Sequence, residues 1–220
     1  MLGFYLLEKC RRYSLKGVFL KTVVSLSFLA IAMAASYEKA GHVLHPFVLG
    51  GLILGLLGDI WLDLKYVHPE SDRLYTYAGF AVFGVGHLLF ANGMLLEFFG
   101  NANGWLILLP VAAAVVFALG NLVLSKPMKL DFGSLKWVVT VYAFLLALTP
   151  GTALLCCFVT NWASITPIML FAGGLSFVIS DVVLSGTYFG QGKERPADFI
   201  LNYLFYYGAQ FTIAFSLLFL

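Results

Sequence analysis

Seven blocks of about 20 mostly apolar residues, the length that a helix needs to cross a bilayer, follow one another along the chain. They cover residues 17–36, 43–64, 74–97, 104–124, 135–158, 163–186 and 198–219. The apolar runs are continuous and do not alternate with polar residues, which disfavours membrane-spanning strands. The sequence therefore predicts an all-α fold: a polytopic transmembrane helix bundle of seven spans. The connections are short, so we expect one integral-membrane domain over residues 1–220.

The composition excludes several classes of protein. Charged residues make up 11% of the 220 residues and apolar residues 61%, whereas soluble domains average about 25% charged and 45–50% apolar residues. A soluble enzyme and a disordered chain are therefore excluded. A net charge of +2 provides no basic field for nucleic acid. We expect a multi-pass protein whose partners are membrane lipids, located in the inner or plasma membrane if the source is bacterial.

The loop cations predict the orientation. With alternating spans, one side of the membrane receives eleven cations and the other side receives only Lys39. The eleven are Lys9, Arg11, Arg12, Lys16, Lys65, Arg73, Lys126, Lys129, Lys136, Lys193 and Arg195. Because cytoplasmic loops are enriched in Lys and Arg, the N-terminus is predicted to be cytoplasmic and the C-terminus outside. Residues 1–7 are apolar but too few to cross, and we expect them at the interface.

A few ionisable residues lie inside the predicted spans, where such groups are costly and often functional. They are Lys21, Asp59, Asp63, His87 and Asp181. Asp59 and Asp181 each lie about six residues before the cytoplasmic end of their span, which places both roughly 8–10 Å inside that face at 1.5 Å per residue. Two carboxylates at one depth suggest a shared site.

Other polar residues fall at the same level. Asn121 and Tyr142 do so in the fourth and fifth spans. In the last span the spacing of the polar residues forms a stripe along one helix face; these are Asn202, Tyr203, Tyr206, Tyr207 and Gln210. We therefore predict a polar pocket in the cytoplasmic half of the bundle, with Asp59 and Asp181 as catalytic groups. The predicted substrate-binding residues are Lys21, His87, Asn121, Tyr142, Asn202, Tyr203, Tyr206, Tyr207 and Gln210.

Structural interpretations stand beside these functional ones. Lys21 can simply neutralise one of the aspartates, His87 can be a hydrogen-bonded packing residue, and the tyrosines can be aromatic filling. The small residues Gly51 and Gly55 favour close helix packing. No set of His and Cys residues shares one depth, so no metal site is predicted.

The order of the polar motifs resembles the YhhN family of membrane proteins. Lys21 is followed by LLGDIWL at 56–62, by the spacing Gly79-x₃-Phe83-x₃-His87-x₂-Phe90, by Tyr142, by FVISDVVL at 177–184 and by Tyr206-Tyr207-x₂-Gln210. The resemblance covers residues 18–215. It departs at Thr22, where the family usually has Pro, and at Phe90, where a Tyr is usual. Family members generally have eight spans.

The resemblance implies a lysoplasmalogenase, which hydrolyses the vinyl-ether bond of a lysolipid substrate to a fatty aldehyde and a glycerophospho-head group. It implies no metal or organic cofactor. The residues fit this chemistry independently, because cleavage of a vinyl ether needs one acid that protonates carbon and one anion that activates water, as a pair of carboxyl groups provides in glycosidases. The residues leave open which aspartate is the acid.

Two other functions use the same residues. A transporter or channel would relay protons or bind a cation at the intramembrane aspartates. A metal-dependent, ceramidase-like seven-span lipid hydrolase would need a cluster of His residues at the level of the aspartates, where the sequence offers only His87 at intermediate depth. The vinyl-ether hydrolase is the function that we predict.

Overall fold

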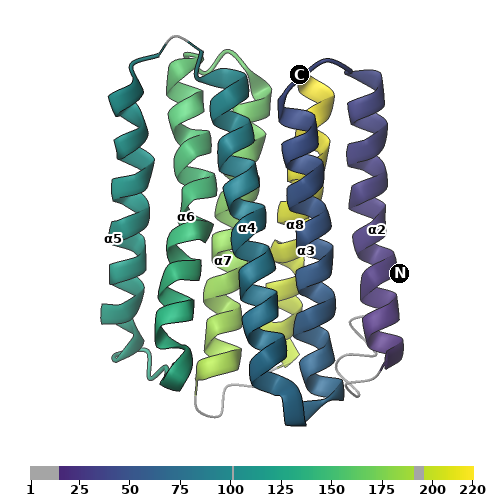
Figure 1. The fold of residues 1–220 in the computed structure, drawn as a ribbon, viewed down its shortest axis with the longest axis vertical. Helices are drawn as coiled ribbons and strands as arrows, with labels where there is room; N and C mark the ends of the chain where they lie inside the picture. The colour runs from purple at the N-terminus through teal and green to yellow at the C-terminus, as the bar shows by residue number, and fades with distance from the viewer. Residues whose placement is uncertain (1–14, 101, 191–195) are drawn as a thin grey trace.

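A computed structural model describes residues 15–100, 102–190 and 196–220, and these residues form a bundle of seven long helices. The helices are α2 (Leu15–Glu38), α3 (Leu44–Val67), α4 (Asp72–Phe98), α5 (Leu108–Ser125), α6 (Lys136–Val159), α7 (Ile165–Phe189) and α8 (Pro196–Ser216). Single 3₁₀ turns precede α4, α5 and α6 and follow α8; they are η1 (Pro69–Ser71), η2 (Gly104–Ile107), η3 (Gly133–Leu135) and η4 (Leu217–Phe219). The chain runs up and down the bundle, and the end of α8 lies beside the end of α2 (Figure 1).

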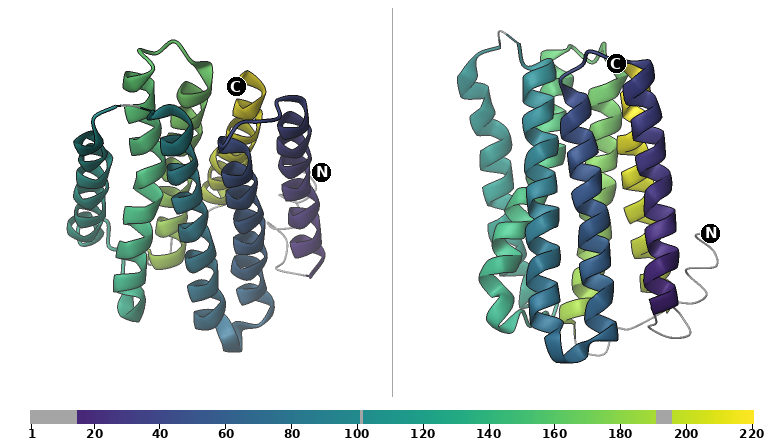
Figure 2. Two further views of the ribbon diagram at one scale, coloured as in Figure 1. Left: turned by 45° about the horizontal axis from the view of Figure 1, so that its top comes forward. Right: turned by 45° about the vertical axis from the view of Figure 1, so that its right-hand side comes forward.

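Six of the helices form a closed ring. Going around it, α2 packs on α3, α3 on α4, α4 on α6, α6 on α7 and α7 on α8, and α8 returns to α2. Two further views show α8 beside α2, which closes the ring (Figure 2). Helix α5 lies outside, at the left edge of Figure 1, and its main contact is with α6. Polar side chains of all six helices can meet in the interior of this ring.

The predicted helices are confirmed, with ends that differ by a few residues from the apolar blocks. Six of the described helical segments are long and apolar enough to cross a membrane, so the protein is a multi-pass membrane protein. The seventh predicted span is α8, which is less apolar because it carries the polar stripe. That stripe is buried: Asn202, Tyr206 and Gln210 are each at most 5% exposed. Its polar groups therefore face the ring interior and not the lipid.

The described cations gather at one end of the bundle. Lys16 lies at the start of α2, Lys65 at the end of α3, Arg73 at the start of α4 and Lys136 at the start of α6, and Lys126 and Lys129 follow α5. Lys39 lies at the opposite end, after α2. This arrangement agrees with the loop assignment from which the cytoplasmic N-terminus is predicted. The predictions for residues 1–7, Lys9, Arg11, Arg12, Lys193 and Arg195 lie outside the described residues.

Gly51 and Gly55 lie where side chains of neighbouring helices pack closely against α3, as the packing interpretation predicts. A Cβ at Gly51 would overlap the ring of Phe90 on α4, and one at Gly55 would lie 2.8 Å from the amide nitrogen of Gln210 on α8. A side chain at position 51 would require the Phe90 ring to move, and one at position 55 would require the end of the Gln210 side chain to shift. The two glycines therefore allow α3 to contact α4 and α8 at once.

We expect Gly51→Ala to destabilise the bundle. The added methyl group overlaps the Phe90 ring, which is 2% exposed and cannot move into open space, and overpacking of this kind costs about 1–3 kcal/mol. Gly120→Ala is the matched control, because nothing lies within 4 Å of a Cβ on this α5 glycine. Thermal unfolding of the purified proteins in detergent measures the difference, and a Gly51→Ala protein that melts at or above the wild-type temperature would contradict this packing.

Candidate active site

A small polar cavity lies inside the ring, and both aspartates line it, Asp59 from α3 and Asp181 from α7. Every helix of the ring contributes to its wall, and α5 does not. The remaining lining residues are Lys21, Leu62, Phe80, Phe83, Tyr142, Phe177, Ser180, Leu184, Tyr188, Asn202, Tyr203 and Tyr206. The cavity volume is about 30 Å³, and a water needs roughly 10–15 Å³ of such space together with polar partners. The cavity therefore has room for water next to the carboxyl groups.

Asp59 is held by three donors. The Lys21 ammonium lies 3.0 Å from Oδ1, and Oδ2 accepts hydrogen bonds from the Ser25 hydroxyl at 3.0 Å and from the Tyr206 hydroxyl at 2.7 Å. Gln210 in turn donates to the Tyr206 oxygen at 3.0 Å. The Asp59 side chain is almost fully buried. An ammonium and two hydroxyl donors around one buried carboxylate favour its anionic form.

Lys21 also pairs with a second carboxylate, Asp63, at 3.5 Å. The spacing explains this geometry, because residues four apart lie on the same helix face: Lys21 and Ser25 face inward from α2, and Asp59 and Asp63 face them from α3. The structure therefore contains the ion pairs that the structural interpretation of Lys21 predicts. Its ammonium lines the cavity but is engaged by two carboxylates.

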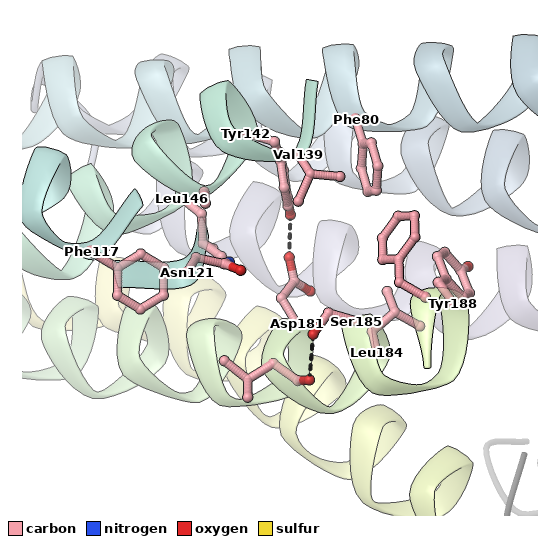
Figure 3. Close-up of a pocket in the computed structure, with 13 residues that line it drawn as sticks. Phe80, Phe117, Asn121, Val139, Tyr142, Leu146, Asp181, Leu184, Ser185 and Tyr188 are labelled. Atoms are coloured by element: carbon pink, nitrogen blue, oxygen red, sulfur yellow. Dashed lines mark hydrogen bonds between the residues drawn. The ribbon is translucent and has the colours of Figure 1, made fainter. Parts of the chain in front are cut away.

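Asp181 has a different environment. The Tyr142 hydroxyl, from α6, donates a hydrogen bond to Asp181 Oδ2. Within the part of the chain that the structure describes, no Lys, Arg or His side chain lies within ion-pairing distance of Asp181. Figure 3 shows the carboxyl group reaching from α7 toward Tyr142 across the space between the two helices. Asp181 therefore has a phenol where Asp59 has an ammonium.

Ser180, the residue before Asp181, joins α7 to α8 by hydrogen bonds with Asn202. The side-chain amide of Asn202 donates to the Ser180 carbonyl at 2.8 Å and to the Ser180 hydroxyl at 2.9 Å. The Ser180 hydroxyl donates back to the Asn202 carbonyl at 3.2 Å. Both side chains are buried. These reciprocal hydrogen bonds fix the rotation of α7 at the turn that carries Asp181. Asn202 therefore positions the Asp181 carboxyl group.

A second cavity, of about 40 Å³, adjoins Asp181 on the side of α5. Asn121 and Phe117 of α5 line it, together with Leu146 of α6 (Figure 3). The first cavity shares five lining residues with this one, and the hydrogen-bonded pair Tyr142 and Asp181 therefore lies at the boundary of the two spaces; the shared residues are Phe80, Tyr142, Asp181, Leu184 and Tyr188. Asn121 therefore shares the level of the aspartates, as predicted, but it lies beyond the bond and not beside Asp59.

His87 lies outside both cavities. Its Nδ1 is 2.9 Å from the Thr149 hydroxyl, and its ring packs edge-on against Phe177 with the centroids 4.7 Å apart. The side chain is 1% exposed, and Nε2 has no partner among the described residues. These contacts match the interpretation of His87 as a hydrogen-bonded packing residue. The structure does not place it beside the carboxyl groups.

The polar stripe of α8 divides into two groups. Asn202, Tyr203 and Tyr206 line the cavity of the aspartates, whereas Tyr207 and Gln210 do not. Tyr207 packs against the rings of Tyr203 and Tyr206, and Gln210 lies behind Tyr206. The first group can contact a molecule in the cavity, and the second supports it.

The sequence did not predict every residue that contributes to this site, and three of the omissions are informative. Ser25 donates to Asp59, and its position one turn after Lys21 would have identified it. Ser180 belongs to a small-residue pattern that indicates only packing. Phe80, whose ring stacks on Tyr142 with centroids 5.0 Å apart, has no sequence signal, because it is one of 21 phenylalanines.

The described residues contain no group of three or more His, Cys, Asp and Glu side chains that could hold a metal ion. The acidic groups of the cavity are instead balanced by Lys21 and by hydroxyl donors. The chemistry open to this arrangement is proton transfer by two carboxyl groups with unlike partners, next to a space for water.

Comparison with known proteins assigns the chain to a family. The family model named YhhN matches residues 17–217, which contain Lys21, both aspartates and all of α3–α8. The chain belongs to the YhhN family. No curated protein and no solved structure matches it. All the residues that line the cavity of this YhhN protein lie within the matched range.

We expect Lys21→Met to destabilise this YhhN protein strongly. Removing one partner of a buried ion pair leaves uncompensated charge and typically costs about 3–5 kcal/mol, and here two carboxylates lose their cation. Lys126→Met, which removes an exposed cation at the end of α5, is the control and should unfold like the wild type.

Adding Asp59→Asn and Asp63→Asn to Lys21→Met should recover most of the lost stability, because the two charges that Lys21 pairs with are then removed as well. Thermal unfolding in detergent of the single, control and triple variants measures both effects. If the triple variant is no more stable than Lys21→Met, the ion cluster does not have the role described.

Proposed function

We propose that this YhhN protein is a membrane hydrolase that cleaves the vinyl-ether bond of lysoplasmalogens. The products are a fatty aldehyde and glycerophosphoethanolamine or glycerophosphocholine. The observation that carries the proposal is the asymmetry of the two carboxyl groups that share one cavity. Asp59 lies against an ammonium and two hydroxyl donors, whereas Asp181 lies against the hydroxyl of Tyr142. This contrast supports one anion and one proton donor, which the reaction requires.

The reaction begins with proton transfer to carbon. Asp181, in its protonated form, delivers its proton to the vinyl carbon remote from the ether oxygen. The double-bond electrons form the new C–H bond, and the carbon bonded to oxygen becomes an oxocarbenium ion. The anion of Asp59 faces the developing positive charge, and electrostatic stabilisation of this kind acts strongly where water is largely excluded. Tyr142 holds the Asp181 carboxyl group in place.

Water completes the reaction. The Asp59 carboxylate takes a proton from a water molecule as its oxygen bonds to the oxocarbenium carbon, which gives a hemiacetal. The hemiacetal then returns its hydroxyl proton to Asp181 as the carbon–oxygen bond to glycerol breaks, and Asp59 gives its proton to the leaving oxygen. One water is consumed, and both carboxyl groups recover their starting forms. Lys21 and Tyr206 orient Asp59 and do not contact the reacting atoms in this scheme.

We expect Asp59→Asn and Asp181→Asn each to lower aldehyde release at least about a hundredfold, since general acid–base groups typically contribute that much or more. Asp72→Asn is the control, because Asp72 is an exposed carboxylate at the start of α4. The assay uses purified protein in detergent with a vinyl-ether lysolipid, so it needs no sealed membrane and would give no signal from a transporter. Wild-type turnover in either cavity variant would rule out the two-carboxylate mechanism.

The site of protonation gives an independent test. In D₂O the exchangeable proton of Asp181 becomes deuterium, so the aldehyde should carry one deuterium on the carbon next to its carbonyl carbon. Trapping the aldehyde at once as an alcohol by reduction prevents later exchange, and mass spectrometry counts the label. The matching saturated ether lysolipid should not be cleaved, because it has no double bond to protonate. Aldehyde without deuterium would contradict protonation at carbon.

A further inference from the structure

A groove on the outer surface of the bundle, between α4 and α6, adjoins the cavity of the aspartates. Its walls include Tyr77 and Ala81 of α4 and Trp137, Val141 and Leu145 of α6. No charged side chain lines it, and its volume is about 440 Å³. Val141 and Trp137 are 58% and 71% exposed, and in a membrane-spanning bundle such side chains face lipid. We call this feature the α4–α6 groove.

Two stacked aromatic rings form the inner wall of the α4–α6 groove. Phe80 and Tyr142 line the groove on one side and the cavity of the aspartates on the other. Their ring centroids are 5.0 Å apart and the ring planes differ by 20°. The Tyr142 hydroxyl donates to Asp181, so the wall itself ends at a catalytic carboxyl group. A molecule in the groove is therefore separated from Asp181 by one layer of side chains.

The sizes of the three spaces indicate which portion of a lipid each can hold. The cavity of the aspartates and the one beside α5 measure about 30 and 40 Å³, enough for water but not for a hydrocarbon chain. The α4–α6 groove, at about 440 Å³, is more than ten times larger than either, and its volume lies in the range of roughly 300–1,000 Å³ that is usual for small-molecule sites. Its apolar lining excludes a charged head group, since an unpaired buried charge is costly.

We propose that the α4–α6 groove binds the hydrocarbon chain of a single-chain ether lysolipid and presents the vinyl-ether bond to the aspartates past Phe80 and Tyr142. The occupant follows from the position of the groove, because this apolar space adjoins both the lipid and the wall that carries Tyr142. The chain thus enters from the bilayer, while water is held on the other side of the wall. This inference rests on the proposed function for the identity of the lipid.

Photolabelling tests the site without turnover. The probe is a saturated 1-O-alkyl lysolipid with a diazirine on its chain, which the proposed reaction does not cleave. Purified full-length protein in detergent is irradiated with the probe, and mass spectrometry maps the labelled residues. We expect labels on the groove residues of α4 and α6, and competition by unlabelled lysolipid but not by a two-chain phospholipid. Labels spread over the lipid-facing surface, labels concentrated beside Phe117 or equal competition by the two-chain lipid would each overturn the proposal.

Two matched tryptophan variants sharpen the test. Val141→Trp fills the α4–α6 groove, whereas Val116→Trp places the same side chain at a 70% exposed position of α5 that lines none of the three spaces. Both positions face outward, so neither substitution disturbs the core. We expect Val141→Trp to abolish groove labelling and to raise the KM for a long-chain substrate about tenfold, a discrimination that a misfit of methylene size can give. Val116→Trp should change neither quantity.

The same experiments separate this inference from the proposed reaction. Groove labelling by the probe without any aldehyde from a vinyl-ether lysolipid would refute the reaction and leave a lysolipid site in the groove. Aldehyde release that Val141→Trp does not impair, with labels elsewhere, would refute the groove and leave the reaction. A short-chain, water-soluble vinyl ether should lose much less activity in Val141→Trp than the long-chain substrate does, because its chain does not fill the groove. An equal loss for both substrates would contradict a chain-binding role.

Discussion

The interaction on which this structure depends is the pairing of Lys21 with Asp59 and Asp63 inside the bundle. An isolated charge inside the bundle costs several kcal/mol even after the protein relaxes. One ammonium can offset this cost for two carboxylates only if all three groups lie within ion-pairing distance. The cluster fixes the rotation and the depth of α2 against α3. Through the bond from Tyr206 to Asp59 it also fixes α8. Three helices of the ring are thereby set by one group of charges.

This arrangement makes the two aspartates of the cavity unequal. Asp59 belongs to the ion cluster, so its position is determined by the same contacts that hold α2, α3 and α8 together. Asp181 is held instead by α6 and α7: the Tyr142 hydroxyl donates to it from α6, and the Ser180–Asn202 bonds join α7 to α8. These two sets of contacts meet at the cavity, and α8 takes part in both. The difference in electrostatic surroundings on which the proposed division of roles rests is thus a consequence of how the ring is assembled.

The depth of the polar groups in the bundle could be predicted from the sequence much better than the direction in which each side chain points. Hydrophobic length predicts where helices begin and end, and the fixed rise of a helix turns a residue number into a depth, so Asp59, Asp181 and Tyr142 could be placed at one level. Which residues face each other depends on helix order and rotation, and these follow from packing contacts such as Gly51 against Phe90 that no single sequence reveals. His87 accordingly has the expected depth but points to Thr149, and Asn121 lies beyond the Tyr142–Asp181 bond on a helix outside the ring.

The placement of α5 outside the ring bears on how a lipid can reach the carboxyl groups. Any approach from the bilayer has to pass between two packed helices of the closed ring, and α5, whose main contact is with α6, leaves the α4–α6 groove uncovered. Here α6 is flanked by α5 on one side and α4 on the other, and the aromatic wall of Phe80 and Tyr142 lies directly behind the α4–α6 contact. The proposed reaction needs a proton donor shielded from bulk water and a limited supply of water for its second step. A thin aromatic wall between a lipid-facing groove and a cavity of water size meets both needs with the same side chain, Tyr142, that holds Asp181.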